Sequence, residues 1–298
     1  MPPPIFGNGG LAIAAVSAAA AYFCAVQRSC ARKALLSTSA SGERGFRLVC
    51  RPNTYLVGEA SARYVAETVK EIVASKGHAR VIFATGASQF NFINSLVSLG
   101  GIPWDKVTAF HLDEYVDLPG GDAHPASFRK YLKERLFTKL RPECKEVHLL
   151  DPAQLGAYAA LLTADEIDLA CIGIGENGHI AFNDPPVADF SDPEQVKVVD
   201  LDEKCRLQQV GEGWFASLEE APTKAVSLTC PAIMRAKRIS CVVPDKRKAA
   251  AVKDTMNGTV TTACPASVLT THEDCIMWID DFAGSRLSGP VLDRAKNF

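Results

Sequence analysis

The sequence lacks the cysteine and histidine spacings that hold metal ions or build a disulfide framework. Its ten cysteines are scattered along 298 residues, and no two of them form a Cys-x-x-Cys pair. Several, such as Cys171, Cys241 and Cys275, lie inside apolar runs, where cysteine behaves as a small hydrophobic residue. The pattern indicates a reducing compartment and leaves metal catalysis without a ligand set.

A strong charge of either sign is also absent. The chain has 32 Lys and Arg against 34 Asp and Glu, a formal net charge of −2 at pH 7, so no basic surface argues for a nucleic-acid partner. A hydrophobic content of 47% is typical of a globular protein. Because the sequence has no internal repeat and no long linker, we expect one domain.

A run long enough to cross a membrane is missing at the N-terminus. The apolar run Leu11 to Val26 has sixteen residues, whereas a helical span needs about 20. Arginines and serines follow it with few acids, which favours a targeting leader; a disordered or helical extension is the alternative. We therefore predict an extension over residues 1–44, a folded domain over 45–298 and no stable membrane insertion. The expected location is cytoplasmic, or an organelle if the extension is a leader.

From Phe46 onward the chain alternates apolar strands with amphipathic helices. Glu59 to Ala74, for example, places apolar residues at helical spacing with charged residues outward. The predicted strands are FRLVC, ARVIFA, VTAFHL, EVHLL, DLACIGI, VKVVD, AVSLT, RISCVVP and CIMWID. Since nearly all of them are apolar on both faces, the pattern predicts an α/β fold: a Rossmann-like, doubly wound, largely parallel sheet with helices on both faces.

The most informative stretch is IGIGENGHIAFNDPP, residues 172–186, which follows a buried strand. It carries Asn177, His179 and Asp184 among three glycines. In an open α/β sheet the ligand binds beyond the carboxyl ends of the strands, and glycines let the backbone approach it closely. An ordinary loop with one surface histidine is the alternative, but the crowding of polar groups favours a functional site.

A second strand end carries Thr85, Gly86, Ala87 and Ser88 before a helix. Small residues at a helix N-terminus form a nest of backbone N–H groups that suits a phosphate. A plain strand–helix turn capped by Ser88 is the alternative. The turn is neither a dinucleotide-binding fingerprint nor a Walker loop, so no nucleotide or redox cofactor is expected.

Two further strand ends carry charge. Asp113 and Glu114 follow VTAFHL, where a carboxylate in a ligand cleft would move protons beside a carbonyl. Lys248 follows RISCVVP, and its neighbours by themselves indicate a solvated helix lysine. Together these residues indicate a small anionic substrate and a sugar-phosphate isomerase or hydrolase that needs no metal.

Three blocks in the right order resemble the glucosamine-6-phosphate deaminase (isomerase) family from Phe46 to Leu287. The first is FHLDEYVDLP with HPASF, the second is GENGHIAFNDP, and the third is PAIMRAKRISCVV with DKRKAAAV. The related 6-phosphogluconolactonases share the fold, but typically carry Asp-Glu-Arg in the first block and lack the Phe-Asn-acid ending of the second.

The resemblance implies a role for each matching residue. Asp113 is the base that moves a proton between C2 and C1, His179 assists ring opening, and Asp184 orients that imidazole. Asn177 stands where family members carry Asp or Asn, and it is expected to be the fourth catalytic residue. The phosphate is cradled by Thr85, Gly86, Ala87, Ser88 and Lys248. The implied reaction, in amino-sugar metabolism, converts glucosamine 6-phosphate to fructose 6-phosphate and ammonia without metal or organic cofactor, and it leaves a homo-oligomer open.

Some positions depart from the family pattern. Asp184 stands where Glu is usual, so we expect a looser or water-bridged contact with His179. Gln209 stands where many members have a phosphate-binding arginine, and Arg206, one helical turn earlier, would substitute for it. These departures keep two alternatives open. One is a lactonase or a deaminase of another amino-sugar phosphate, and the other is a sugar-phosphate sensor without turnover.

Overall fold

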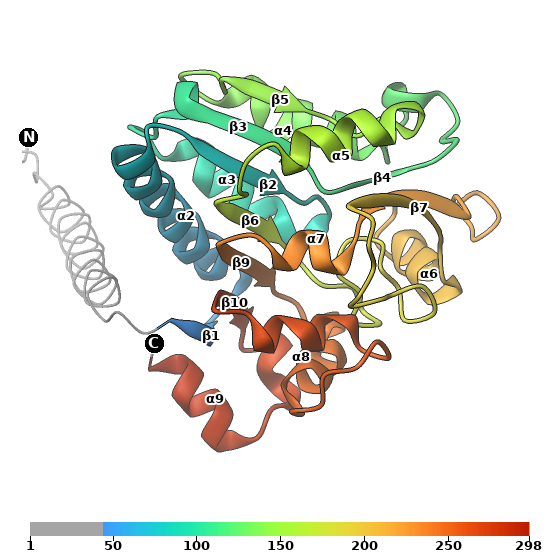
Figure 1. Ribbon diagram of the computed structural model, residues 1–298. Coiled ribbons are helices and arrows are strands. Elements are labelled where there is room, and N and C mark those ends of the chain that lie inside the picture. Colours follow the sequence, from blue (N-terminus) through green and yellow to red (C-terminus); the bar gives the residue numbers. More distant parts are fainter. Residues whose placement is uncertain (1–43, 298) are drawn as a thin grey trace, which may run out of the picture. The chain divides into compact units, whose positions relative to one another are not determined.

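The structure is a computed structural model that describes residues 44–297 (Figure 1). The extension predicted for residues 1–44 lies outside the described residues except for Arg44, so the leader and the domain boundary stay predictions. Within the described part, no helix combines the length and hydrophobicity that a membrane span requires.

The core is a seven-stranded sheet in which every pair of neighbours is parallel. This arrangement confirms the largely parallel sheet that the apolar strands predict. In spatial order the strands are β1 (Gly45–Arg51), β10 (Asp274–Asp280), β9 (Arg238–Val243), β6 (Leu169–Ile172), β2 (Ala79–Phe83), β3 (Val107–His111) and β5 (Glu146–His148).

Helices cover both faces of this sheet, as a doubly wound fold requires (Figure 1). Alternate residues of β2 show the division: Val81 and Phe83 belong to one apolar cluster, and Ile82 belongs to the other. The first cluster contains residues of α2 (Thr54–Lys76), α3 (Phe90–Ser98) and α4 (Phe128–Arg135). The second contains residues of α5 (Leu155–Thr163), α7 (Cys230–Met234), α8 (Ala249–Met256) and α9 (Gly289–Lys296).

A second, three-stranded antiparallel sheet stands beside the carboxyl ends of the main strands. Its order is β4 (Asp113–Tyr115), β8 (Lys224–Leu228) and β7 (Val196–Asp200). The sequence predicts one strand running to Asp113, but β3 ends at His111 and Asp113 begins β4. The chain changes sheet because Tyr115 packs in a separate aromatic cluster, with ring centroids 4.9 Å from Phe128 and 5.3 Å from Phe182.

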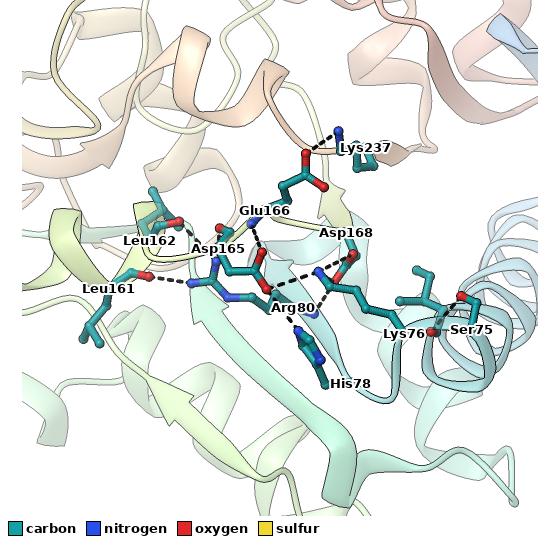
Figure 2. A network of polar contacts seen from close by, with 11 residues as sticks. Ser75, Lys76, His78, Arg80, Leu161, Leu162, Asp165, Glu166, Asp168 and Lys237 are labelled. Atoms are coloured by element: carbon teal, nitrogen blue, oxygen red, sulfur yellow. Dashed lines mark hydrogen bonds and ion pairs between the residues drawn. The ribbon is translucent and has the colours of Figure 1, made fainter.

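A polar network ties the elements together at the amino ends of the central strands (Figure 2). Arg80, buried at the start of β2, donates to the carbonyl oxygens of Leu161 and Asp165. The carboxylate of Asp168 accepts from the backbone N–H of Arg80 at 2.8 Å and from Lys76 at 3.2 Å. This network fixes the end of the sheet that faces away from the polar strand ends, which leaves those ends to build a site.

Candidate active site

The loop after β6 places the imidazole of His179 against bare backbone. The N–H of Gly175 donates to the carbonyl of His179 at 2.9 Å, so the loop folds back on itself. A Cβ added at Gly175 would lie 2.3 Å from Cε1 of His179. Only glycine leaves room for the ring there, which explains why a glycine-rich stretch carries the histidine.

The carboxylate of Asp184 contacts this ring directly. Oδ1 of Asp184 lies 2.7 Å from Nδ1 of His179 and also accepts from the amide of Asn177 at 2.8 Å. The expectation of a looser or water-bridged contact is therefore wrong. The short side chain suffices because the loop closes tightly, with the N–H of Asn183 bonded to the carbonyl of Ile180 at 3.1 Å.

Asp184 is fully buried, and its contacts keep it ionised. Burial alone would raise the pKa of Asp184, but the imidazole of His179 and the hydrogen bonds from Asn177 and the backbone of Asp202 hold it below its ordinary value. An ionised carboxylate only accepts hydrogen bonds, so Nδ1 of His179 carries the proton. Nε2 is then the nitrogen left for proton exchange in the cleft.

Asp113 and Glu114, adjacent in sequence, have different surroundings. Glu114 is fully buried and accepts from the backbone N–H groups of Phe128 and Arg129, at 3.1 and 2.8 Å, at the start of α4. Asp113 is 7% exposed and lines the cleft. Burial raises the pKa of Asp113 well above its ordinary value, and the charge of Glu114 raises it further. Glu114 thus anchors β4 to α4, while Asp113 is the carboxyl group available to a ligand.

The turn Thr85–Ser88 offers backbone N–H groups beyond β2. Gly86 has a positive φ of 100°, and its carbonyl accepts from the hydroxyl of Tyr131 at 3.0 Å. Ser88 does not cap the following helix, since its hydroxyl instead accepts from the amide of Gln89 at 3.1 Å. The alternative of a plain strand–helix turn capped by Ser88 is therefore wrong.

Lys248 is only 3% exposed, although Lys246 and Arg247, which precede it, are exposed. Its local sequence indicates a solvated lysine, and that interpretation is wrong. Asp245, at a φ of 90°, turns the chain after β9, and its N–H donates to Asp280 at 3.1 Å. This turn buries Lys248 in the cleft, where desolvation lowers its pKa.

One cleft collects most of these side chains. Asp113, His179, Lys248 and the turn Thr85–Ser88 all line it, and Asn177 and Asp184 stand behind His179. From α6 (Glu203–Gly211) the resemblance implies only Gln209 and Arg206 as candidates for this cleft, and it does not reveal Gln208 or Glu212, the residue after the helix. The residues lining the cleft that were not anticipated as such include Gln208, Glu212, Phe128 and Phe182.

Arg206 does not substitute for an anion-binding arginine. Its guanidinium donates to the carbonyl oxygens of Leu218 and Ala221, the latter at 2.9 Å, and it does not line the cleft. Gln209 does line the cleft and is buried. The i, i+3 spacing predicts that Arg206 shares a helix face with Gln209. The long side chain of Arg206 reaches the carbonyl oxygens of Leu218 and Ala221 instead.

The fold also assembles a potential set of metal ligands that the scattered cysteines do not reveal. Ligand atoms of His179, Asp184 and Cys205 lie within 4.8 Å of one another, and all three residues are buried. Imidazole, carboxylate and thiolate are ligands of a zinc-type ion. In the structure the direct bond between His179 and Asp184 occupies two of these groups.

Comparison with known proteins identifies the family. A family model described as glucosamine-6-phosphate isomerases/6-phosphogluconolactonase matches residues 53–278. The glucosamine-6-phosphate deaminase of Bacillus cytotoxicus is 34% identical over 230 residues, which cover 76% of this chain and 84% of that protein. That of a Thermoanaerobacter species is 33% identical over 237 residues, 76% and 91% of the two chains.

Comparison with solved structures leads to the same family. A monomeric glucosamine-6-phosphate deaminase superposes with a TM-score of 0.71 at 28% identity, covering 80% of this chain and 99% of the other. The 6-phosphogluconolactonase of Leishmania guyanensis, at 14% identity and a TM-score of 0.65 over 82% and 99% of the chains, shares the fold. The chain therefore belongs to the family of glucosamine-6-phosphate isomerases and 6-phosphogluconolactonases.

Proposed function

We propose that this protein is a glucosamine-6-phosphate deaminase, which converts glucosamine 6-phosphate to fructose 6-phosphate and ammonia. The observation that carries the proposal is that Asp113, the imidazole of His179 and an anion cradle line one cleft. The relatives that are 33 and 34% identical carry this name, which supports the choice of substrate.

Binding would begin at the phosphate. The backbone N–H groups of Thr85–Ser88 and the ammonium group of Lys248 hold it, because a turn that presents several N–H groups and a buried cation suits a dianion. This contact would leave C1 and C2 of the sugar in the part of the cleft that Asp113 and His179 line.

Two proton-transfer steps follow there. Nε2 of His179 takes the proton of the anomeric hydroxyl and passes it to the ring oxygen, which opens the ring, and Asp184 stabilises the imidazolium form between these two transfers. Asp113 then removes the proton from C2 and returns it at C1. Its raised pKa makes it a stronger base than an ordinary carboxylate. In the same step the carbonyl oxygen at C1 gains a proton and the protonated amino group loses one, so the 2-amino aldose becomes a 1-hydroxy-2-iminium compound. Addition of water to the iminium carbon then releases ammonia and fructose 6-phosphate.

The test is the release of ammonia and fructose 6-phosphate from glucosamine 6-phosphate by the wild type and by Asp113→Asn. The variant should lose roughly 10²–10⁴-fold in kcat, the usual contribution of a general base, yet bind fructose 6-phosphate with a similar Kd. Absence of ammonia from the wild type would contradict the proposal. Hydrolysis of 6-phosphogluconolactone instead would identify a lactonase, and tight binding without product would identify a sensor.

A further inference from the structure

The cleft contains a carboxylate, Glu212, that the proposed mechanism does not use. It caps the C-terminal end of α6 and lines the cleft. One of its oxygens accepts from the side-chain amide of Gln208 at 2.9 Å, and the other accepts from the indole N–H of Trp214 at 3.2 Å. Two donors therefore hold the carboxylate in place.

Both donors are themselves fixed by the rest of the site. Gln208 accepts from the backbone N–H of Glu176, in the loop that carries His179, at 2.8 Å. The ring of Trp214 packs edge-on against Tyr131 at 6.5 Å, and Tyr131 bonds the carbonyl of Gly86 in the anion-binding turn. Glu212 is thus held in a fixed position in the wall of the cleft.

The charge of Glu212 acts on the anion-binding end of the cleft. Lys248 is the one lysine or arginine among the described residues that line the cleft. Of the carboxylates that act on Lys248, Glu212 has the largest effect and Glu176 the next, and neither forms an ion pair with it. A phosphate placed at the turn would therefore share the cleft with one buried cation and with the carboxylate of Glu212.

We propose that the carboxylate of Glu212 belongs to the anion site and limits how strongly the turn Thr85–Ser88 and Lys248 hold a phosphate group. Because the phosphate alone is held weakly, tight binding requires a sugar that also reaches Asp113 and His179. Glu212 therefore disfavours small dianions such as inorganic phosphate. The inference rests on the proposed function, since it takes the anion at the turn to be the phosphate of a sugar.

The test measures the Kd of inorganic phosphate and of fructose 6-phosphate by calorimetry for wild type, Glu212→Gln and Glu212→Ala. Removing one like charge from a partly screened site should lower the Kd of inorganic phosphate roughly five- to tenfold in both variants. The Kd of fructose 6-phosphate should fall by a similar factor, because the same charge acts on its phosphate group. The matched control is Glu203→Gln, which removes the same charge from an exposed position of α6 outside the cleft and should leave both Kd values within about twofold.

An unchanged or higher Kd in both Glu212 variants would overturn the inference. Tightening in Glu212→Gln alone would also overturn it, because the new amide would then be donating to the phosphate. Ammonia release is measured separately on the wild type. If the wild type deaminates but the Glu212 variants do not tighten, only this inference fails, whereas a wild type that neither binds nor turns over sugar phosphates removes the proposed function.

Discussion

At the residue scale, the ring of His179 depends on a missing side chain. Gly175→Ala would put a Cβ at 2.3 Å from the ring and push the imidazole out of line with Asp184. Since a misplacement of about 1 Å can cost roughly 10²-fold, we expect kcat/KM for ammonia release to fall by about that factor. The control is Gly156→Ala in α5, where an added Cβ meets no atom within 4 Å and activity should not change.

A second residue-scale prediction concerns His111, whose ring is fully buried and has no hydrogen-bond partner at either nitrogen in the described structure. Burial lowers the pKa of His111 to about 3. The unfolded chain binds a proton near the ordinary value of about 6.5 and the folded chain does not, so stability falls as the pH drops from about 6.5 toward 3.

The titration of His111 should change the free energy of unfolding by about 1.4 kcal/mol per pH unit in this range. The variant His111→Leu removes the titrating group without leaving an unpaired polar atom. Its unfolding free energy, measured with urea between pH 6.5 and 4.5, should therefore depend less on pH than that of the wild type. Identical slopes in the two proteins would contradict the assignment.

At the scale of elements, Arg80 joins β2 to the end of α5. Its guanidinium donates to the carbonyl of Leu161 in the last turn of that helix and to Asp165 beyond it (Figure 2). The carbonyl of Leu161 otherwise accepts only a long bond of 3.4 Å from the N–H of Ala164 at the end of the helix, and an arginine there satisfies it better. Arg80→Met keeps the apolar stem but loses these bonds, so the unfolding free energy should fall by about 1.5–3 kcal/mol.

The control for Arg80 is Lys237→Met, which breaks an ion pair with Glu166 in the same region at exposed side chains. Exposed pairs contribute about 0.2–1 kcal/mol, so this variant should lose less. Neither change touches the cleft, and kcat/KM for ammonia release should stay unchanged in both. A loss of activity in folded Arg80→Met would mean that the two ends of the sheet are coupled.

The scale of elements also shows what a sequence can predict. Apolar strands between amphipathic helices identify the strands of the main sheet and the loops at their carboxyl ends, because burial on both faces leaves a direct pattern. The second sheet leaves no such signal, since the sequences of β7 and β8 resemble those of the other strands. Their assembly with β4 depends instead on packing around Tyr115. The burial of Lys248 was missed for the same reason, because it depends on the turn at Asp245.

At the scale of the whole molecule, the buried charge of Lys248 should lower the free energy of unfolding of the ligand-free protein. Lys248 is buried without an ion pair among the described residues, and a buried charge without a partner costs free energy. Lys248→Met should therefore raise the Tm of the ligand-free protein and weaken binding of sugar phosphates. Fructose 6-phosphate should raise the Tm of the wild type by linkage and have little effect on the variant. A lower Tm for the ligand-free variant would contradict this view.

The two ends of the described chain meet at one edge of the main sheet, because β1 is the edge strand and α9 packs against it (Figure 1). A short linker from Asn297 to Arg44 would therefore close the backbone into a ring without disturbing the core. New termini at the exposed Gly120 would then reorder the segments along the chain while leaving every wall of the cleft in place. A circular permutant of this kind should fold and retain its activity.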